Sequence, residues 1–142
     1  MRKITFLTVM ALALAVIAVP AQASKSKPRS PKPKCVPHAV SFEVSGTLTT
    51  AGTLTANTDG TYSGSLTVQV TKTNNHAKTY KRTTQSYTLN HARVSFGHHV
   101  STTAPAAGSR ANLKGTITTE SKKCGTFTPT ITIVKVELHA AK

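Results

Sequence analysis

The stretch NTDGTYSGSLTVQV, residues 57–70, contains a turn signal followed by a regular alternation of residue types. Its first four residues are typical of a tight turn, because Asn, Asp and Gly tolerate the backbone conformations that such turns need. The positions that share one face after the turn are Tyr62, Gly64, Leu66, Val68 and Val70. Small polar residues stand between them, and a period of two predicts a strand with one side in a core and the other in water. The stretch therefore predicts the second half of a β-hairpin.

The same alternation extends outward from this hairpin. Upstream, one face carries Val40, Phe42, Val44 and Leu48, and the pattern resumes at Leu54. Downstream, three further strands are predicted: one that opens at Tyr87, one with Ala111, Leu113, Gly115 and Ile117 inward, and one from about Phe127 to Leu138. No window after the first 23 residues has a helical period. Five strands are expected, of which the first and the last are long and bent.

The alternation changes phase at two places. The apolar positions move from odd to even numbers between Leu89 and Ala92, and again between Ile133 and Val134. A β-bulge or tight bend near Asn90–His91 would absorb the first extra residue. Phase changes of this kind are expected where strands bend.

The stretch AGSRANLKGTI, residues 107–117, resembles the Gly-containing turn and fourth strand of many bacterial OB-like domains. The OB-fold is a small Greek-key barrel of five strands, and the resemblance covers residues 38–139. It implies a fourth strand antiparallel to the first, and a binding face on the second and third strands with their loops. The predicted fold class is thus all-β, a five-stranded OB-like Greek-key barrel. A small β-sandwich is the alternative, although the immunoglobulin kind usually needs about seven strands.

Residues 1–23 have the parts of a secretory signal peptide. Arg2 and Lys3 form the positive start, an apolar run follows, and the small-x-small sequence AQA ends at Ala23. We expect cleavage after Ala23 and a secreted or periplasmic protein with no integral membrane association after cleavage. An uncleaved membrane anchor is the alternative.

A basic, proline-rich tail is predicted at residues 24–34. Three prolines separate its basic residues, which are Lys25, Lys27, Arg29, Lys32 and Lys34. A run without apolar residues cannot build a core and favours extended polyproline II, so the tail is expected to be disordered. It serves either as a solvated linker or as an arm that binds anionic polymers.

The chain contains two cysteines, Cys35 and Cys124. In an exported protein such a pair most simply forms a disulfide, and two free thiols are the alternative. The OB resemblance agrees with a disulfide, because it places the end of the fourth strand beside the start of the first. Residues 35–142 are expected to form a single β-barrel domain.

The chain has 18 Lys and Arg against 4 Asp and Glu, a net charge of +14. We expect this charge to concentrate in the tail and in two loops around a nearly uncharged, Thr-rich barrel. The candidate polyanion-binding residues in the two loops are Lys78, Tyr80, Lys81, Arg82, Lys122 and Lys123. Sequence-specific nucleic-acid binding is not expected, because the polar face of the second strand offers no aromatic platform for bases. A simple solvated set of loops is the alternative.

Catalysis, metal binding and cofactors are not expected. The six histidines lack ligand spacing, and the four acids are scattered without a paired-carboxylate motif. The sequence therefore favours an exported binding module for anionic polymers, such as cell-wall polymers, anionic carbohydrate or extracellular nucleic acid. The alternatives are a structural or protein-binding envelope domain and an enzyme whose acids converge only in the fold. A concave face lined with Lys, Arg and Tyr would favour the first class, and a flat Thr surface the second.

Overall fold

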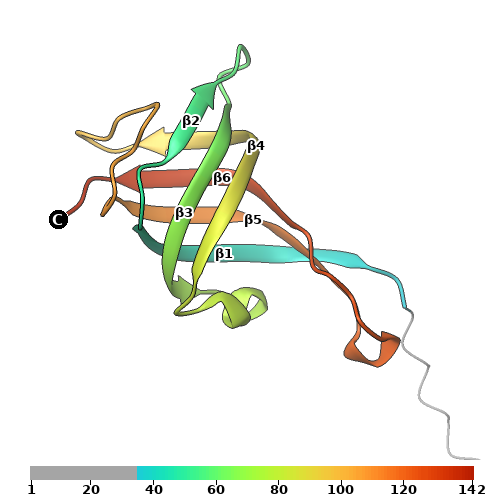
Figure 1. Ribbon diagram of the computed structural model, residues 1–142. Helices are drawn as coiled ribbons and strands as arrows, with labels where there is room; N and C mark the ends of the chain where they lie inside the picture. The colour runs from blue at the N-terminus through green and yellow to red at the C-terminus, as the bar shows by residue number, and fades with distance from the viewer. Residues whose placement is uncertain (1–34) are drawn as a thin grey trace, which may run out of the picture. The chain divides into compact units, whose positions relative to one another are not determined.

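The computed structural model describes residues 35–142, which form six strands and two short 3-10 helices (Figure 1). The strands are β1 (His38–Leu48), β2 (Thr53–Ala56), β3 (Tyr62–Thr73), β4 (Thr84–Phe96), β5 (Arg110–Thr119) and β6 (Ile131–His139). The 3-10 helices are η1 (Asn75–Tyr80) and η2 (Lys122–Cys124). The predicted signal peptide and the basic tail, with its five candidate residues, lie outside the described residues. In residues 35–142 no helix is long and apolar enough to span a bilayer.

Five of the strands close into a barrel. Their hydrogen-bonded order is β1-β5-β6-β4-β3, and β1 also pairs with β3 (Figure 1). All of these pairs are antiparallel except β4 with β6, which is parallel. The all-β barrel is confirmed, its topology is compatible with an OB-like fold, and the sandwich alternative is wrong.

The predicted first strand is divided into β1 and β2. Residues 49–52 interrupt it, because the chain turns there from the pairing of β1 with β3 to the pairing of β2 with β3. The last strand also differs from the prediction, since β6 begins at Ile131 and not near Phe127. The predicted strand began too early because the prediction started at the apolar residue Phe127, and residues 127–130 belong to no strand.

The residues that alternate in the sequence fill the barrel. The largest side chains with less than 2% exposure include Phe42, Leu66, Leu89, Leu113 and Leu138. Burying such a side chain stabilises the fold by roughly 1.5–3 kcal/mol relative to leaving it in water. The core therefore comes from all five barrel strands, and the outer faces remain polar.

Both predicted phase changes are bulges. On β4, Leu89 pairs with Gly64 and Ala92 with Tyr62, so β4 carries one residue more than β3. His91 lies in this bulge with a φ of 52°. On β6, Val134 is the extra residue relative to β5, and its side chain is 52% exposed. Because of each bulge, the apolar residues before it and those after it along the strand all point into the barrel.

A third bulge lies where β1 pairs with β5 on one edge and with β3 on the other. Ser45 pairs with Lys72 and Gly46 with Val70, which leaves Thr71 as the extra residue on β3. A Cβ atom at Gly46 would overlap the carbonyl oxygen of Gln69. Glycine at this position therefore allows the two backbones to approach closely.

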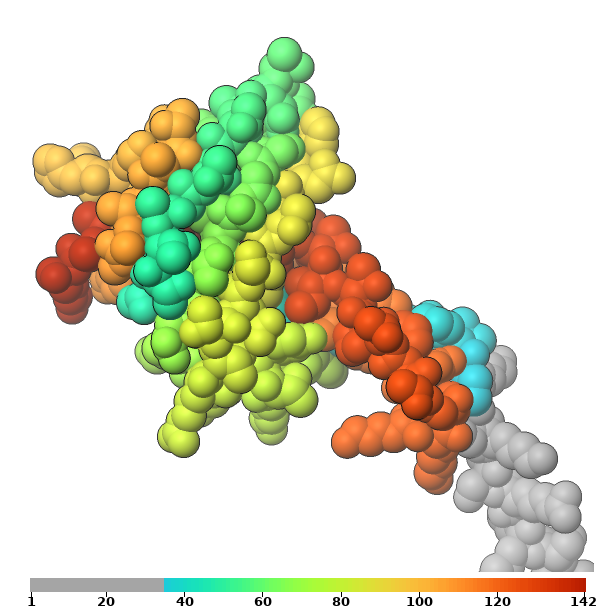
Figure 2. Space-filling view, in the orientation of Figure 1, coloured from blue at the N-terminus to red at the C-terminus, as the bar shows by residue number. Residues whose placement is uncertain are grey.

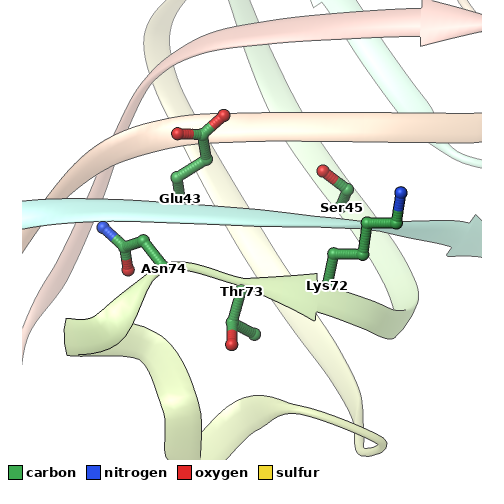
Figure 3. Close-up of a pocket in the computed structure, with 5 residues that line it drawn as sticks. All are labelled: Glu43, Ser45, Lys72, Thr73 and Asn74. Carbon is green, nitrogen blue, oxygen red and sulfur yellow. The ribbon is translucent and has the colours of Figure 1, made fainter.

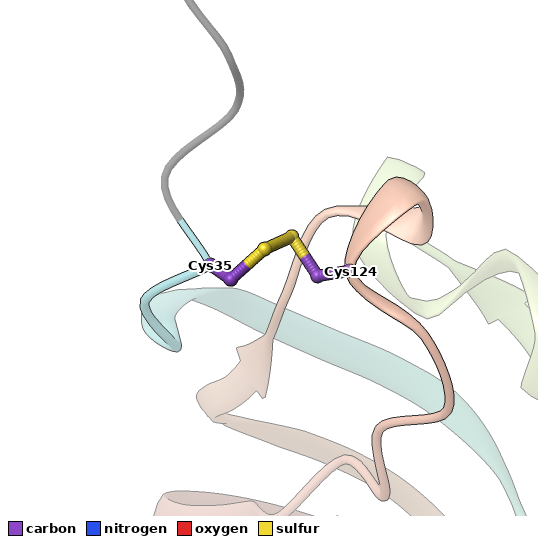
Figure 4. Close-up of a disulfide and its surroundings, with 2 residues drawn as sticks. All are labelled: Cys35 and Cys124. Atoms are coloured by element: carbon purple, nitrogen blue, oxygen red, sulfur yellow. A yellow bond between two sulfur atoms is a disulfide. The ribbon is translucent and has the colours of Figure 1, made fainter.

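The disulfide between Cys35 and Cys124 is confirmed (Figure 4). The two Cα atoms are 5.5 Å apart, and 89 residues separate the cysteines in the sequence. The antiparallel pairing of β1 with β5, from His38 opposite Thr119, brings the two cysteines together. The bond thus fastens the segment after β5 to the start of β1.

Replacing Tyr87 with phenylalanine is expected to raise the free energy of unfolding by about 1 kcal/mol. The hydroxyl of Tyr87 is buried and has no hydrogen-bond partner among the described residues, and such an orphaned group costs about 1–3 kcal/mol. The ring of the variant would keep its contact with Phe42, whose centroid is 5.9 Å away. Urea unfolding measures the change, with Tyr62→Phe as a half-buried control.

The unchanged protein should also lose stability at alkaline pH because of Tyr87. Burial raises the pKa of Tyr87 to about 12 from an ordinary value of 10.0. Stability that depends on its protonated form is therefore present below pH 10 and is lost as the pH rises toward 12. The variant should lack this loss. A fall in stability at neutral pH on Tyr87→Phe would contradict the prediction.

Candidate functional site

The first predicted basic loop, residues 73–82, begins at the last residue of β3, folds as η1 and is fastened to β1. Asn74 caps η1, because its Oδ1 accepts a hydrogen bond from the backbone N–H of Ala77 at 3.1 Å. The Nδ2 of Asn74 donates to the carbonyl oxygen of Ser41 at 2.9 Å. Ala77 is fully buried, and the ring of Tyr80 meets Phe42 edge-on at 5.7 Å. The candidate bases on this loop, Lys78, Lys81 and Arg82, remain exposed.

The second basic loop was predicted between the fourth and fifth strands, and in the structure it comprises residues 120–130. It contains η2 and is fastened to the start of β1 by the disulfide. Lys122 and Lys123 lie in η2 and are exposed. Gly125 follows η2 with a φ of 101°. The disulfide therefore fixes the position of a loop that has few regular backbone hydrogen bonds of its own.

The two loops border one hollow, here called the loop hollow, of about 350 Å³. His76, Thr79 and Tyr80 line it from the first loop, and the second loop contributes one carboxylate, one lysine and four uncharged residues: Glu120, Lys122, Ser121, Gly125, Phe127 and Pro129. The end of β5 contributes Ile117 and Thr119. Figure 2 shows the two loops, yellow-green and orange-red, next to each other along the lower part of the molecule. Of the candidate residues, Tyr80 and Lys122 line the hollow, whereas Lys78, Lys81, Arg82 and Lys123 belong to the same loops without lining it.

The barrel is not nearly uncharged, which corrects the sequence prediction. Five bases lie on strands with partly or fully exposed side chains: Lys72, Arg93, Arg110, Lys114 and Lys135. Cross-strand register places Lys114 opposite Lys135, and Lys135 opposite Arg93. These five bases are distant from one another in the sequence, so they form no run of charge that would predict a basic surface. Their positions alternate with apolar residues along the strands, and this alternation predicts that their side chains lie on the outside of the barrel.

Two of the strand bases have acidic partners. Lys114 lies 3.5 Å from Glu43, and Lys135 lies 2.8 Å from Glu137. The hydrogen bond from Lys135 is the main cause that lowers the pKa of Glu137. An acid on the outer face of a strand commonly pairs with a neighbouring base, as Glu43 and Glu137 do here. Because both pairs are exposed, each contributes little to stability.

A shallow pocket of about 250 Å³ adjoins Glu43 on the outside of β1. Figure 3 shows its lining, with Ser45 and Glu43 on β1 and Lys72, Thr73 and Asn74 from the end of β3 and the residue after it. The side chain of Lys72 rises across β1 beside Ser45, whereas Glu43 stands farther along the strand. Lys72 thus reaches the outer face of β1 without an acidic partner among the described residues.

A carboxylate–histidine contact exists, but it lacks the setting of a catalytic site. Asp59 Oδ2 lies 3.1 Å from His91 Nδ1, and Thr61 Oγ1 lies 3.3 Å from the same nitrogen. Because both groups meet one ring nitrogen, the histidine does not relay a proton between them. The side chains of His91 and Asp59 are 61% and 52% exposed, and neither residue lines the loop hollow or the shallow pocket beside Glu43. Hydrogen bonds from Thr61 are the main cause that lowers the pKa of Asp59 to about 2.

One group of possible metal ligands occurs in the described part of the chain. Atoms of Cys35, Glu120 and Cys124 lie within 4.8 Å of one another. Both sulfurs are joined in the disulfide and offer no thiolate, which is the form that binds metals. This group is therefore a disulfide with a neighbouring carboxylate.

Comparison of the chain with protein-family models, with curated proteins and with solved structures finds no match. The strand order is compatible with an OB-like barrel. An evolutionary relationship with OB domains stays a prediction.

Proposed function

We propose that this protein is an exported, non-enzymatic module that binds anionic polymers without sequence preference. The observation that carries the proposal is the loop hollow, a concave surface between two basic loops with Tyr80 and Lys122 in its lining. A concave surface of this kind favours a binding module over a structural domain with a flat Thr face. Cell-wall polymers, anionic carbohydrate and extracellular nucleic acid all have the required charge.

The electrostatics of the loops support this function. Lys78, Lys81, Arg82, Lys122 and Lys123 form no ion pair within residues 35–142. Unpaired bases can neutralise the charges of a polymer and release its counterions, which drives binding at low salt. The ring of Tyr80 and the apolar side chain of Phe127 add surface on which a sugar or a base can rest.

The proposal includes that the protein is exported and that its barrel is of the OB kind. The disulfide suits an oxidising compartment, as does the signal peptide predicted at residues 1–23. The predicted tail at 24–34 would add five bases to the polymer contact. An OB-like barrel would present this contact next to the loop between its fourth and fifth strands, a loop that OB domains use for oligonucleotides and oligosaccharides.

The test is a salt series with residues 24–142 against labelled oligothymidylate and labelled dextran sulfate, read by fluorescence polarisation. The variant Lys81→Gln with Lys122→Gln removes one base from each loop. We expect the slope of log affinity against log salt, which is negative, to become shallower by about 1.5, and the affinity near 0.1 M salt to fall about tenfold. The control Arg93→Gln with Lys142→Gln removes the same charge elsewhere and should have a smaller effect. Deletion of residues 24–34 should also weaken binding.

Two results would overturn the proposal: no binding of either polymer at low salt, or binding that does not change with salt. Recovery of a single protein partner in high salt would instead favour the structural or protein-binding alternative. Equal effects of the loop variant and its control would refute the assignment to the loops.

A further inference from the structure

A third hollow, of about 280 Å³, opens on the outside of the barrel where β1 pairs with β5 on one edge and with β3 on the other. We name it the corner pocket, and it spans four adjacent strands. Its polar side chains are Ser45 and Thr47 from β1, Thr71 and Lys72 from β3, Arg110 and Asn112 from β5, and His139 from β6. None of these residues belongs to the loop hollow.

The strand register explains why this part of the sheet is concave. Ser45 lies opposite Lys72 on one side and opposite Asn112 on the other. Thr47 lies opposite Arg110, which in turn lies opposite His139. Short side chains on β1 therefore stand between long basic side chains on the neighbouring strands. The result is a trough with hydroxyl groups in its floor and positive charge on both walls.

The corner pocket has no carboxylate in its lining. Lys72 and Arg110 form no ion pair within residues 35–142, and neither does His139. Two acids lie near the pocket on the same outer face, and each has a lysine partner. Glu43 lines the neighbouring shallow pocket with Ser45 and Lys72 and lies 3.5 Å from Lys114. Glu137 is opposite Asn112 and lies 2.8 Å from Lys135. The positive charge of the pocket is therefore available to an outside anion.

Two neutral groups of the pocket have hydrogen-bond donors that face no acceptor among the described residues. Ser45 Oγ donates to Asn112 Oδ1 at 3.4 Å, which leaves the Nδ2 of Asn112 without a partner among the described residues. The hydroxyl of Thr71 donates to the carbonyl oxygen of Ser45 at 3.1 Å and does not serve the pocket. Asn112 and Thr47 can thus donate between the bases on the two walls.

We infer that the corner pocket binds a tetrahedral oxyanion, the phosphate or sulfate group of an anionic polymer. The guanidinium of Arg110 matches two oxygens of such a group, and Lys72 supplies a point charge from the opposite wall. A planar carboxylate has only two oxygens, whereas a tetrahedral group accepts hydrogen bonds from several directions at once. This inference rests on the proposed function and narrows the polymer to one that bears phosphate or sulfate.

The experiment uses residues 24–142 with labelled polyphosphate, dextran sulfate and polyglutamate, together with NMR titrations of inorganic phosphate, sulfate and acetate. The variant Lys72→Gln with Arg110→Gln is compared with Arg93→Gln plus Lys142→Gln. We expect the pocket variant to lose about tenfold in affinity for polyphosphate and dextran sulfate, and less than twofold more than the control for polyglutamate. Inorganic phosphate or sulfate should shift the side-chain amide of Asn112 and the ring of His139, and acetate should not.

Arg110→Lys guards against a loss of folding, since it keeps the charge and removes only the paired donors; it should lower the affinity for phosphate polymers by about threefold. Shifts with free phosphate but no loss for polyphosphate would assign the pocket to a free anion and overturn its role in polymer binding. If the pocket variant matches its control on every polymer while the loop variant still weakens binding, the pocket inference fails and the proposed function stands. If the unchanged protein binds no polymer, the proposed function fails, and with it the inference.

Discussion

Replacing Cys35 and Cys124 together with serine lowers the free energy of unfolding by about 2–5 kcal/mol. The disulfide closes a loop of 89 residues, and in the chain-entropy model this restricts the unfolded chain far more than the folded one. Urea unfolding of the oxidised protein and of the double variant measures the difference. The amides of residues 120–130 should also exchange faster in the variant, because the bond fastens this loop to the start of β1.

The control for this prediction is a reducing agent. Reduced protein should unfold at the midpoint of the double variant, and the double variant itself should not respond to the agent. An unchanged midpoint after full reduction would contradict the prediction. It would mean that the β1–β5 pairing alone holds the second basic loop.

The substitution Gly46→Ala is expected to cost at least about 2 kcal/mol. An added Cβ would overlap the carbonyl oxygen of Gln69 and would lie 2.8 Å from Val68 Cγ1. A backbone oxygen in a paired strand cannot turn aside as the end of a flexible side chain can. The contact between β1 and β3 would therefore have to open at the point where the barrel closes.

Thermal and urea unfolding of Gly46→Ala test this expectation. The neighbouring change Ser45→Ala lies on the outer face and should stay within about 0.5 kcal/mol of the unchanged protein. Equal stability of the two variants would show that the strands separate at little cost, contrary to the role we assign to Gly46.

Much of the fold follows from local patterns. A period of two locates the barrel strands, and a slip of one residue locates the bulges at His91 and Val134, because each strand has to keep its apolar side inward. The pairing of Cys35 with Cys124 also follows, since two cysteines allow one disulfide. These features depend on neighbours in the sequence or on simple counting.

Other features depend on contacts between distant segments and could not be predicted in the same way. Ala77 becomes buried only because Asn74 fastens η1 to Ser41 on β1. The loop hollow exists because the pairing of β1 with β5 and the disulfide bring two loops to one place. The corner pocket depends on how four strands are aligned with one another, and the alternation within a single strand does not predict that alignment.

The closure of the barrel by its first strand has a consequence for the kinetics of folding. Val44 on β1 pairs with Leu113 on β5, so the barrel remains open until most of the chain is present. Domains dominated by such distant pairings fold in milliseconds to seconds, which is slow beside helical bundles. A newly made chain therefore cannot close the barrel until β5 and β6 have been synthesised.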